Sequence, residues 1–82
     1  MEMFLPTVIK VGGYRFFFFS NENDEPLHIH VEKAENYAKF WLKPVSLARN
    51  IGFNQPEIKE IRKILFENQT LIEEKWNGYF NK

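Results

Sequence analysis

Apolar and polar side chains alternate along several segments in the first half of the chain, and this two-residue period is typical of half-buried strands. The alternation predicts strands over residues 7–11, 14–20, 27–33 and 37–43, with a short fifth strand over residues 45–47. Gly12 and Gly13 lie between the first two segments, and glycine tolerates the positive φ angles that a two-residue hairpin turn requires. Polar residues separate the later segments, so the pattern predicts an antiparallel sheet.

The second half of the chain changes to a helical period. Asn54 is a good N-cap, Pro56 fits the first turn of a helix, and Glu57 complements the helix dipole. Apolar residues then recur at spacings of three, four and seven: Ile58, Ile61, Leu65, Ile72 and Trp76. We therefore predict one helix over residues 56–77, with a place where it could bend at residues 68–70. The expected fold class is α+β, with an antiparallel sheet of four or five strands and one long C-terminal helix packed on one face.

The alternation divides the predicted sheet into two faces. One face of the central hairpin is apolar, and we expect the helix to cover it: Ile29, Val31, Ala38, Phe40 and Leu42. The other face is polar and aromatic: His28, His30, Glu32, Tyr37, Lys39, Trp41 and Lys43. Arg15 and Phe17 are expected to join this second face. Because one helix covers only one side of a sheet, we expect the second face to be open or covered by another chain.

Length and composition narrow the class of protein. The 82 residues correspond to a single domain over residues 1–82. The absence of cysteine excludes disulfides and thiolate zinc sites, and it fits a reducing compartment. No apolar run approaches the roughly 20 residues of a membrane span, and the first residues lack the pattern of a signal peptide, so we expect a cytoplasmic protein. The 11 basic and 11 acidic residues cancel, which argues against a broad basic surface for nucleic acid but not against a local patch.

His28 and His30 are the only histidines of the chain, and the strand period places both imidazoles on the second face. Their Cα atoms should lie about 6.6 Å apart, which is two strand rises. Histidine has an unperturbed pKa of about 6.5, close to neutrality. The pair is therefore consistent with an acid and base, with half of a metal site, or with a polar surface that performs no chemistry.

One hypothesis is a metal-independent ribonuclease. Cleaving RNA through its 2′-hydroxyl needs a general base, a general acid and a cation near the phosphate. His28 and His30 could supply the base and acid, and Arg15 or Lys39 the cation. Aromatic side chains on the same face could stack bases: Phe17, Tyr37 and Trp41.

A metal site is the second hypothesis, and otherwise no cofactor is expected. A transition metal at His28 and His30 needs a third ligand. Glu32 lies about 13 Å from His28 along the strand, which is too far without a bend. Asp24 or Glu25, in the preceding loop, could reach His28.

A binding surface is the third hypothesis. Phe17, Tyr37 and Trp41 are residue types that anchor protein interfaces. Phe17 and Phe19 could instead close a second small core under residues 3–5. The number of aromatic residues, 17% of the chain, favours a protein partner or a homodimer.

Residues 12–22 and 25–31 closely resemble a prokaryotic family of small proteins, long catalogued as a domain of unknown function and often labelled the DhiT-type toxin family. The similarity continues to residue 77 and covers nearly the whole chain. The family usually has two prolines before the first histidine, and here Leu27 replaces the second. The motif positions that match are Arg15, His28, His30, Lys39 and Trp41.

The resemblance implies the toxin of a type II toxin–antitoxin pair, bound by a small antitoxin protein, and it brings no established catalytic mechanism. Our leading hypothesis is therefore a toxin that acts on RNA or translation through the face that bears the two histidines. The alternative is a non-catalytic protein-binding module that uses the aromatic face of the sheet.

Overall fold

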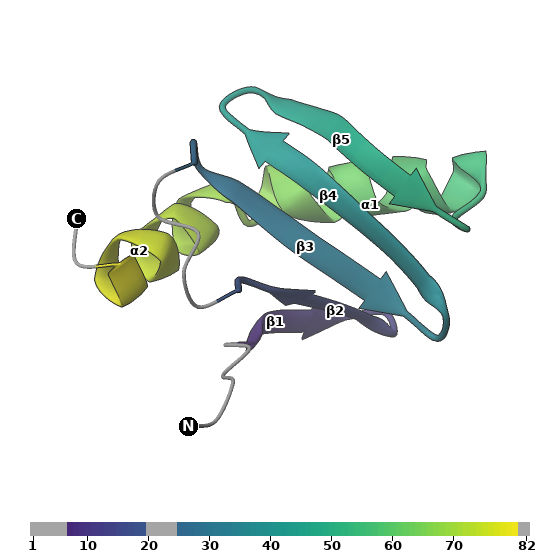
Figure 1. Cartoon of the computed structure of the whole chain (residues 1–82), viewed down its shortest axis with the longest axis horizontal. Helices are drawn as coiled ribbons and strands as arrows, with labels where there is room; N and C mark the ends of the chain where they lie inside the picture. Colours follow the sequence, from purple (N-terminus) through teal and green to yellow (C-terminus); the bar gives the residue numbers. More distant parts are fainter. Residues whose placement is uncertain (1–6, 20–24, 81–82) are drawn as a thin grey trace.

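The computed structural model describes residues 7–19 and 25–80, which form one five-stranded antiparallel sheet and two helices (Figure 1). The strands lie side by side in chain order: β1 (Thr7–Val11), β2 (Tyr14–Phe17), β3 (His28–Lys33), β4 (Asn36–Leu42) and β5 (Val45–Ile51). The helices α1 (Gln55–Glu67) and α2 (Gln69–Phe80) follow. The predicted α+β class and antiparallel sheet are confirmed.

The turns of the sheet follow the local sequence. Gly12 and Gly13 connect β1 to β2 with φ angles of 58° and 85°, as the predicted hairpin turn requires. The fifth strand is longer than the expected residues 45–47, because β5 continues to Ile51. Lys39 pairs with Arg49 and Phe40 pairs with Leu47, so Ala48 is an extra residue in β5. This bulge breaks the alternation, which explains why the pattern of β5 is weak in the sequence.

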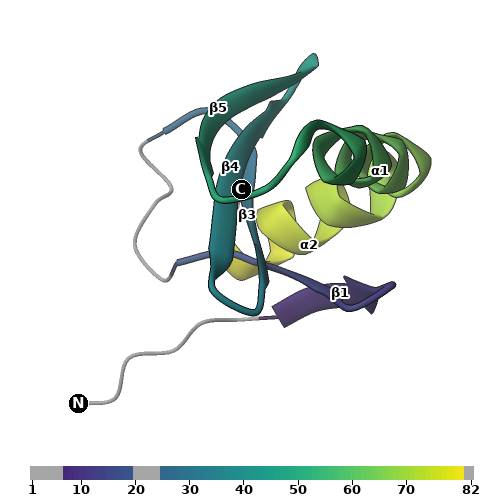
Figure 2. The ribbon, with the colours of Figure 1, turned by 90° about the vertical axis from the view of Figure 1, so that its right-hand side faces the viewer.

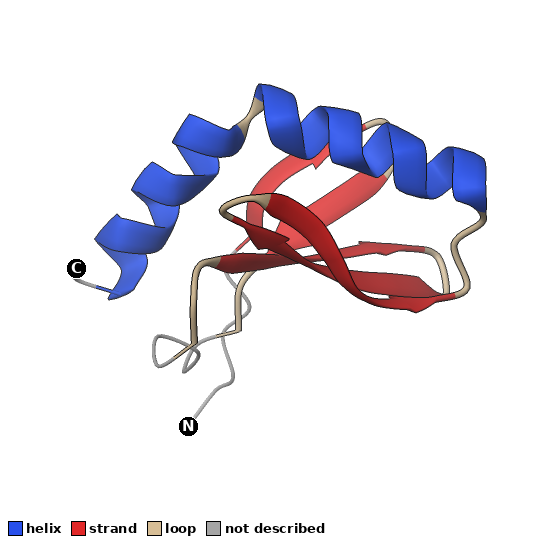
Figure 3. Ribbon diagram, turned by 90° about the horizontal axis from the view of Figure 1, so that it is seen from above, coloured by secondary structure: helices blue, strands red, loops and turns tan. Residues whose placement is uncertain are grey.

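The predicted C-terminal helical segment is present, but it is divided: α1 ends at Glu67 and α2 begins at Gln69, within residues 68–70, where the sequence permits a bend (Figure 3). Asn68 has φ −117° and ψ 17°, outside the helical region. Its side-chain Nδ2 donates a hydrogen bond of 2.8 Å to the carbonyl of Ile64. A short polar side chain that bonds the preceding turn competes with the helical backbone, so the chain changes direction at Asn68.

The start of α1 forms as predicted. The Glu57 backbone N–H donates to Asn54 Oδ1 over 2.9 Å, and the Asn54 N–H donates to Glu57 Oε1 over 3.0 Å. This reciprocal pair is a capping box, and it satisfies two backbone donors that the first turn of a helix leaves without partners.

Both helices pack on one face of the sheet, which we call the inner face (Figure 2). The five residues predicted to lie under the helix are all fully buried: Ile29, Val31, Ala38, Phe40 and Leu42. Apolar side chains of both helices join them in the core: Ile58, Ile61, Leu65, Ile72 and Trp76. The assignment of the inner face is confirmed. Neither helix in the described part of the chain has the length and apolar character that a bilayer span requires.

Candidate functional site

The opposite face of the sheet, which we call the outer face, brings the predicted site residues together. Phe17 pairs with His30 on the neighbouring strand, and His30 pairs with Lys39 on the next. The row on one side contains Arg15, Glu32 and Tyr37, and the row on the other contains His28 and Trp41. All seven predicted site residues therefore lie on one face: Arg15, Phe17, His28, His30, Tyr37, Lys39 and Trp41.

Both histidines are buried within the chain itself, whereas the sequence predicts a second face that is open or covered by another chain. His28 is 0% exposed and His30 is 2% exposed. The rings of Phe19 and Phe17 lie against His30, with centroids 4.5 Å and 5.4 Å away. Among the described residues, aromatic side chains of the same face therefore contribute to the burial of His30.

His28 lies at the edge of this cluster, where α2 reaches the end of the sheet at which β3 begins (Figure 1). The Trp76 ring of α2 lies 5.1 Å from the His28 ring, and the Trp41 ring lies 5.8 Å from it. Trp76 also contacts Phe18 at 5.1 Å. Trp76 was predicted as core only, and its contact with His28 depends on the break at Asn68, which the apolar period of the helix does not reveal.

The two histidines use their Nδ1 atoms differently. His28 Nδ1 lies 2.8 Å from the carbonyl oxygen of Pro26. A carbonyl can only accept, so this nitrogen carries a proton and donates it. His30 Nδ1 lies 2.7 Å from the Tyr37 hydroxyl, which can donate or accept. The two imidazole centroids are 5.1 Å apart and nearly perpendicular.

Two cations lie over aromatic rings of the outer face. The Arg15 guanidinium is 4.6 Å from the centre of the Phe17 ring, and Lys39 Nζ is 4.6 Å from that of Trp41. Each also meets a carboxylate: Arg15 Nη1 is 3.0 Å from Glu32 Oε2, and Lys39 Nζ is 2.8 Å from Glu25 Oε1. The predicted phosphate-binding cations are therefore held in place by both a ring and an acid.

Glu25 also approaches the first histidine, with 3.7 Å between Glu25 Oε1 and His28 Nδ1. It was one of the two acids expected near His28, and the other, Asp24, lies outside the described residues. Across residues 7–19 and 25–80, no three His, Asp or Glu side chains form a group that could hold a metal ion. The proposed third ligand therefore has no support from the described chain.

Arg49 is a residue that the sequence reasoning missed. It pairs with Lys39 across β4 and β5, so it extends the row of Phe17 and His30 toward the sheet edge. Its side chain is exposed, and it makes no ion pair with any described residue. The bulge at Ala48 reverses the apparent alternation, so only the observed register assigns Arg49 to the outer face.

An accessible hollow lies beside Trp41, at the edge of this cluster. It has a volume of about 430 Å³, and its lining is largely apolar: Pro26, Leu27, Trp41, Lys43, Pro44 and Ser46. Trp41 is half-buried, whereas Phe17, another predicted anchor, is 3% exposed. The structure therefore presents Trp41 rather than Phe17 to a partner. The cover suggested for Phe17 and Phe19, residues 3–5, lies outside the described residues.

Comparison with protein families matches residues 13–77 to a family described as domain of unknown function (DUF4160). The matched region begins at the β1–β2 turn and continues through most of α2, so it contains every residue of the outer face named above. Comparison with curated proteins gives no match, and comparison with solved structures gives none either.

Proposed function

We propose that this chain, which belongs to the DUF4160 family, is the toxin of a type II toxin–antitoxin module and acts through the outer face on RNA or the translation machinery. The resemblance drawn from the sequence supplies the module, with a small antitoxin protein as partner and a cytoplasmic location. One structural observation supports the choice of surface: the sheet register gathers cations and aromatic rings on the face that the helices leave free.

Lys39, Arg49 and Trp41 are the residues best placed for this role. Lys39 and Arg49 lie opposite one another on neighbouring strands, and Trp41 lies under the ammonium group of Lys39. Cations bind phosphates without reading sequence, and an aromatic ring can stack a base. A small local patch of this kind is compatible with a chain of zero net charge.

The burial of the histidines favours a positioning role for them over acid–base catalysis. A general base must come within about 2.6–3.2 Å of the proton that it removes. His28 and His30 lie beneath aromatic side chains, and each already has a hydrogen-bond partner at Nδ1. Ribonuclease chemistry at this pair stays a prediction, and it would require the covering rings to move.

A second candidate function, a non-catalytic protein-binding module, is favoured by the hollow beside Trp41. Two prolines and Leu27 line it together with the indole ring, so an apolar side chain from another protein would fit there. On this interpretation Trp41 anchors a partner protein or a second copy of the chain, and no reaction takes place.

The experiment is induced expression in a bacterial host, with growth and total RNA followed over time. We expect wild type to arrest growth, and Lys39→Glu and Arg49→Glu to relieve the arrest because they reverse charge on the outer face. Lys75→Glu is the matched control, because Lys75 is an exposed lysine on α2, and it should remain as toxic as wild type. A wild-type chain that leaves growth unchanged would refute the toxin proposal.

Variants that keep an aromatic ring test the role of the histidines. His30→Phe preserves the ring contacts with Phe17 and Phe19 but removes all acid–base chemistry, and the same holds for His28→Phe beside Trp41. If the histidines only position the outer face, both folded variants should stay toxic. A loss of RNA cleavage by about 10²–10⁴-fold in folded variants would instead support catalysis.

A further inference from the structure

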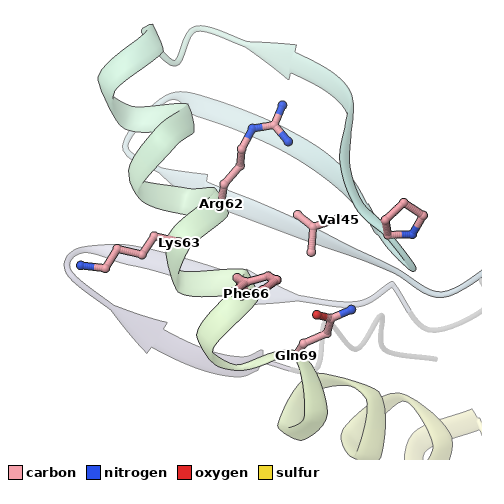
Figure 4. A pocket seen from close by; sticks show the side chains of 6 residues that line it. Val45, Arg62, Lys63, Phe66 and Gln69 are labelled. Atoms are coloured by element: carbon pink, nitrogen blue, oxygen red, sulfur yellow. The ribbon is translucent and has the colours of Figure 1, made fainter.

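Phe66 is the most exposed large apolar side chain of the described residues, at 74%. It lies near the end of α1 and lines a cavity of about 480 Å³ between α1 and the start of β5 (Figure 4). The other lining residues come from both elements and their flanks: Pro44, Val45, Arg62, Lys63 and Gln69. Phenylalanine is one of the residue types enriched at protein interfaces, and here it is displayed beside an open groove.

The strand β5, on the other side of the groove from α1, is also incompletely covered by the helices. Leu47 of β5 pairs with Phe40 of β4 and shares its inner face, yet Leu47 is 36% exposed whereas Phe40 is fully buried. Val45, which pairs with the buried Leu42, is half-buried. The helices therefore cover the inner face of β4 but leave apolar side chains of β5 accessible beside Phe66.

The groove is positively charged along its α1 side. Arg62 and Lys63 lie three and four residues after Lys59 and precede Phe66 by four and three, so all four share one side of the helix. None of these three cations makes an ion pair with a described residue. Figure 4 shows Arg62, Val45 and Gln69 facing the space between α1 and β5.

Two of the three acidic residues of α1 are engaged elsewhere, and the third, Glu67, is exposed at the end of the helix. Glu60 accepts a hydrogen bond from the Tyr14 hydroxyl over 2.9 Å, and Glu57 completes the capping box with Asn54. The Arg62 guanidinium lies 5.7 Å from the centre of the Phe40 ring, which places its charge over the apolar floor of the groove. Lys59, Arg62 and Lys63 thus outnumber Glu67 along the exposed part of α1, so the net charge of the helix beside the groove is positive.

We propose that the groove between α1 and β5 is the docking site for an acidic amphipathic segment of a partner protein. An apolar side chain of that segment packs against Phe66 and Val45, and its carboxylates meet Arg62, Lys63 and Lys59. The identification of this partner as the antitoxin rests on the proposed function. The site lies on the side of the sheet opposite to the outer face, so the proposed docking surface and the proposed target surface do not overlap.

The lining favours a protein segment over RNA. The side chains of Val45 and Pro44 are aliphatic and offer no hydrogen bonds to a base edge. The amide of Gln69 already donates from Nε2 to the carbonyl oxygen of Leu42. An apolar anchor flanked by carboxylates satisfies both the aliphatic walls and the cations.

The test is an NMR titration of the full chain with three probes. The first is a synthetic 16-residue amphipathic peptide with leucine on one face and glutamate elsewhere. The second replaces every glutamate with lysine, and the third is a single-stranded oligouridine of similar length. We expect saturable amide shifts confined to residues 45–47 and 59–69 with the glutamate peptide only, and we expect this binding to weaken as salt is added.

Substitutions in the groove test which side chains contribute to binding of the glutamate peptide. Phe66→Ala and the double variant Arg62→Glu/Lys63→Glu should each weaken binding of the glutamate peptide and raise its Kd by about tenfold or more. Tyr79→Ala and Lys75→Glu on α2 are the matched controls, because both side chains are exposed and lie outside the groove, and they should leave the Kd unchanged. All five substituted positions are on the surface, so the fold should be preserved.

Three results would overturn the proposal: no saturable shifts in the groove, equal binding of the lysine peptide, or the same shifts produced by oligouridine. The growth assay keeps this inference separate from the proposed function. A toxic chain that fails to bind the glutamate peptide refutes the docking site alone. A chain that binds the peptide through Phe66 but does not slow growth refutes the toxin proposal alone.

Discussion

The two faces of the sheet are both buried at their centre, but by different means. On the inner face, Ile29 and Phe40 are covered by two helices that lie far along the chain. On the outer face, two rings lie against His30: that of Phe17, the last residue of β2, and that of Phe19, two residues further along the chain. Neighbouring aromatic side chains on one face of a sheet can therefore contribute to the burial of a polar ring, as the helices do on the other face.

The largest difference should appear when a ring is removed from the inner face. Phe40→Ala should lower the free energy of unfolding by about 3–5 kcal/mol, because it empties a fully buried site under both helices. Leu47→Ala, at the paired position on β5, is the matched control and should cost less than about 1 kcal/mol because its side chain is partly exposed. Urea unfolding measures both. Equal effects at the two positions would mean that β5 is covered as fully as β4.

Substitutions at His30 on the outer face should lower the free energy of unfolding by a smaller but measurable amount. His30→Ala should cost roughly 2 kcal/mol, because it removes a buried ring and leaves the Tyr37 hydroxyl without its 2.7 Å partner. His30→Phe keeps the ring and should cost about 1 kcal/mol, the value of one hydrogen bond. The same urea experiment compares them. A loss below about 0.5 kcal/mol for His30→Ala would show that His30 is a solvated surface residue and that the outer face is not buried at its centre.

The stability of the fold should also be sensitive to a substitution at Gly52, in the loop that connects β5 to α1. Its φ angle is 101°, and an added Cβ would lie 2.2 Å from Asn36 Oδ1. Gly52→Ala should therefore cost about 1–2 kcal/mol through backbone strain. Gly78→Ala is the opposite case, because Gly78 lies in α2 with nothing within 4 Å of the added Cβ, and it should stabilise by about 0.5–1 kcal/mol. Thermal unfolding should shift in opposite directions for the two variants.

The smallest effect concerns the one tyrosine buried on the inner face. Burial, followed by the hydrogen bond to Glu60, raises the pKa of Tyr14 from 10.0 to about 12. Above pH 10 the unfolded chain loses this proton while the folded chain keeps it, so stability present below pH 10 should decline as pH rises toward 12. Urea unfolding at pH 8 and pH 11 checks the sign. Tyr14→Phe should show a shallower decline, and an equal decline would place the titration elsewhere.

Much of the local structure could be predicted because it depends on neighbours in the sequence. The period-two pattern located four strands, and Gly12 and Gly13 marked the first turn. Asn54 and Glu57 marked the helix start, because a capping box involves residues only three apart. The alternation also divided the central hairpin correctly, which is why the seven site residues were expected on one face.

Features that depend on distant contacts could not be predicted. The bulge at Ala48 changes which residues of β5 lie on the outer face, so Arg49 was missed. The break at Asn68 turns α2 toward the start of β3 and brings Trp76 against His28. The amino-acid pattern around Asn68 permitted a bend, but only packing determined its direction.

The sequence by itself determined the strands, the capped helix start, the two faces of the sheet and the resemblance on which the proposed function rests. Only the tertiary structure decided that His28 and His30 are enclosed, that their Nδ1 atoms meet Pro26 and Tyr37, and that Phe66 lies beside an open basic groove. The physical reason is one of range. The periodicity of the sequence indicates on which face of a strand or helix a side chain lies. Burial depends on which other side chains, from any part of the chain, cover that face.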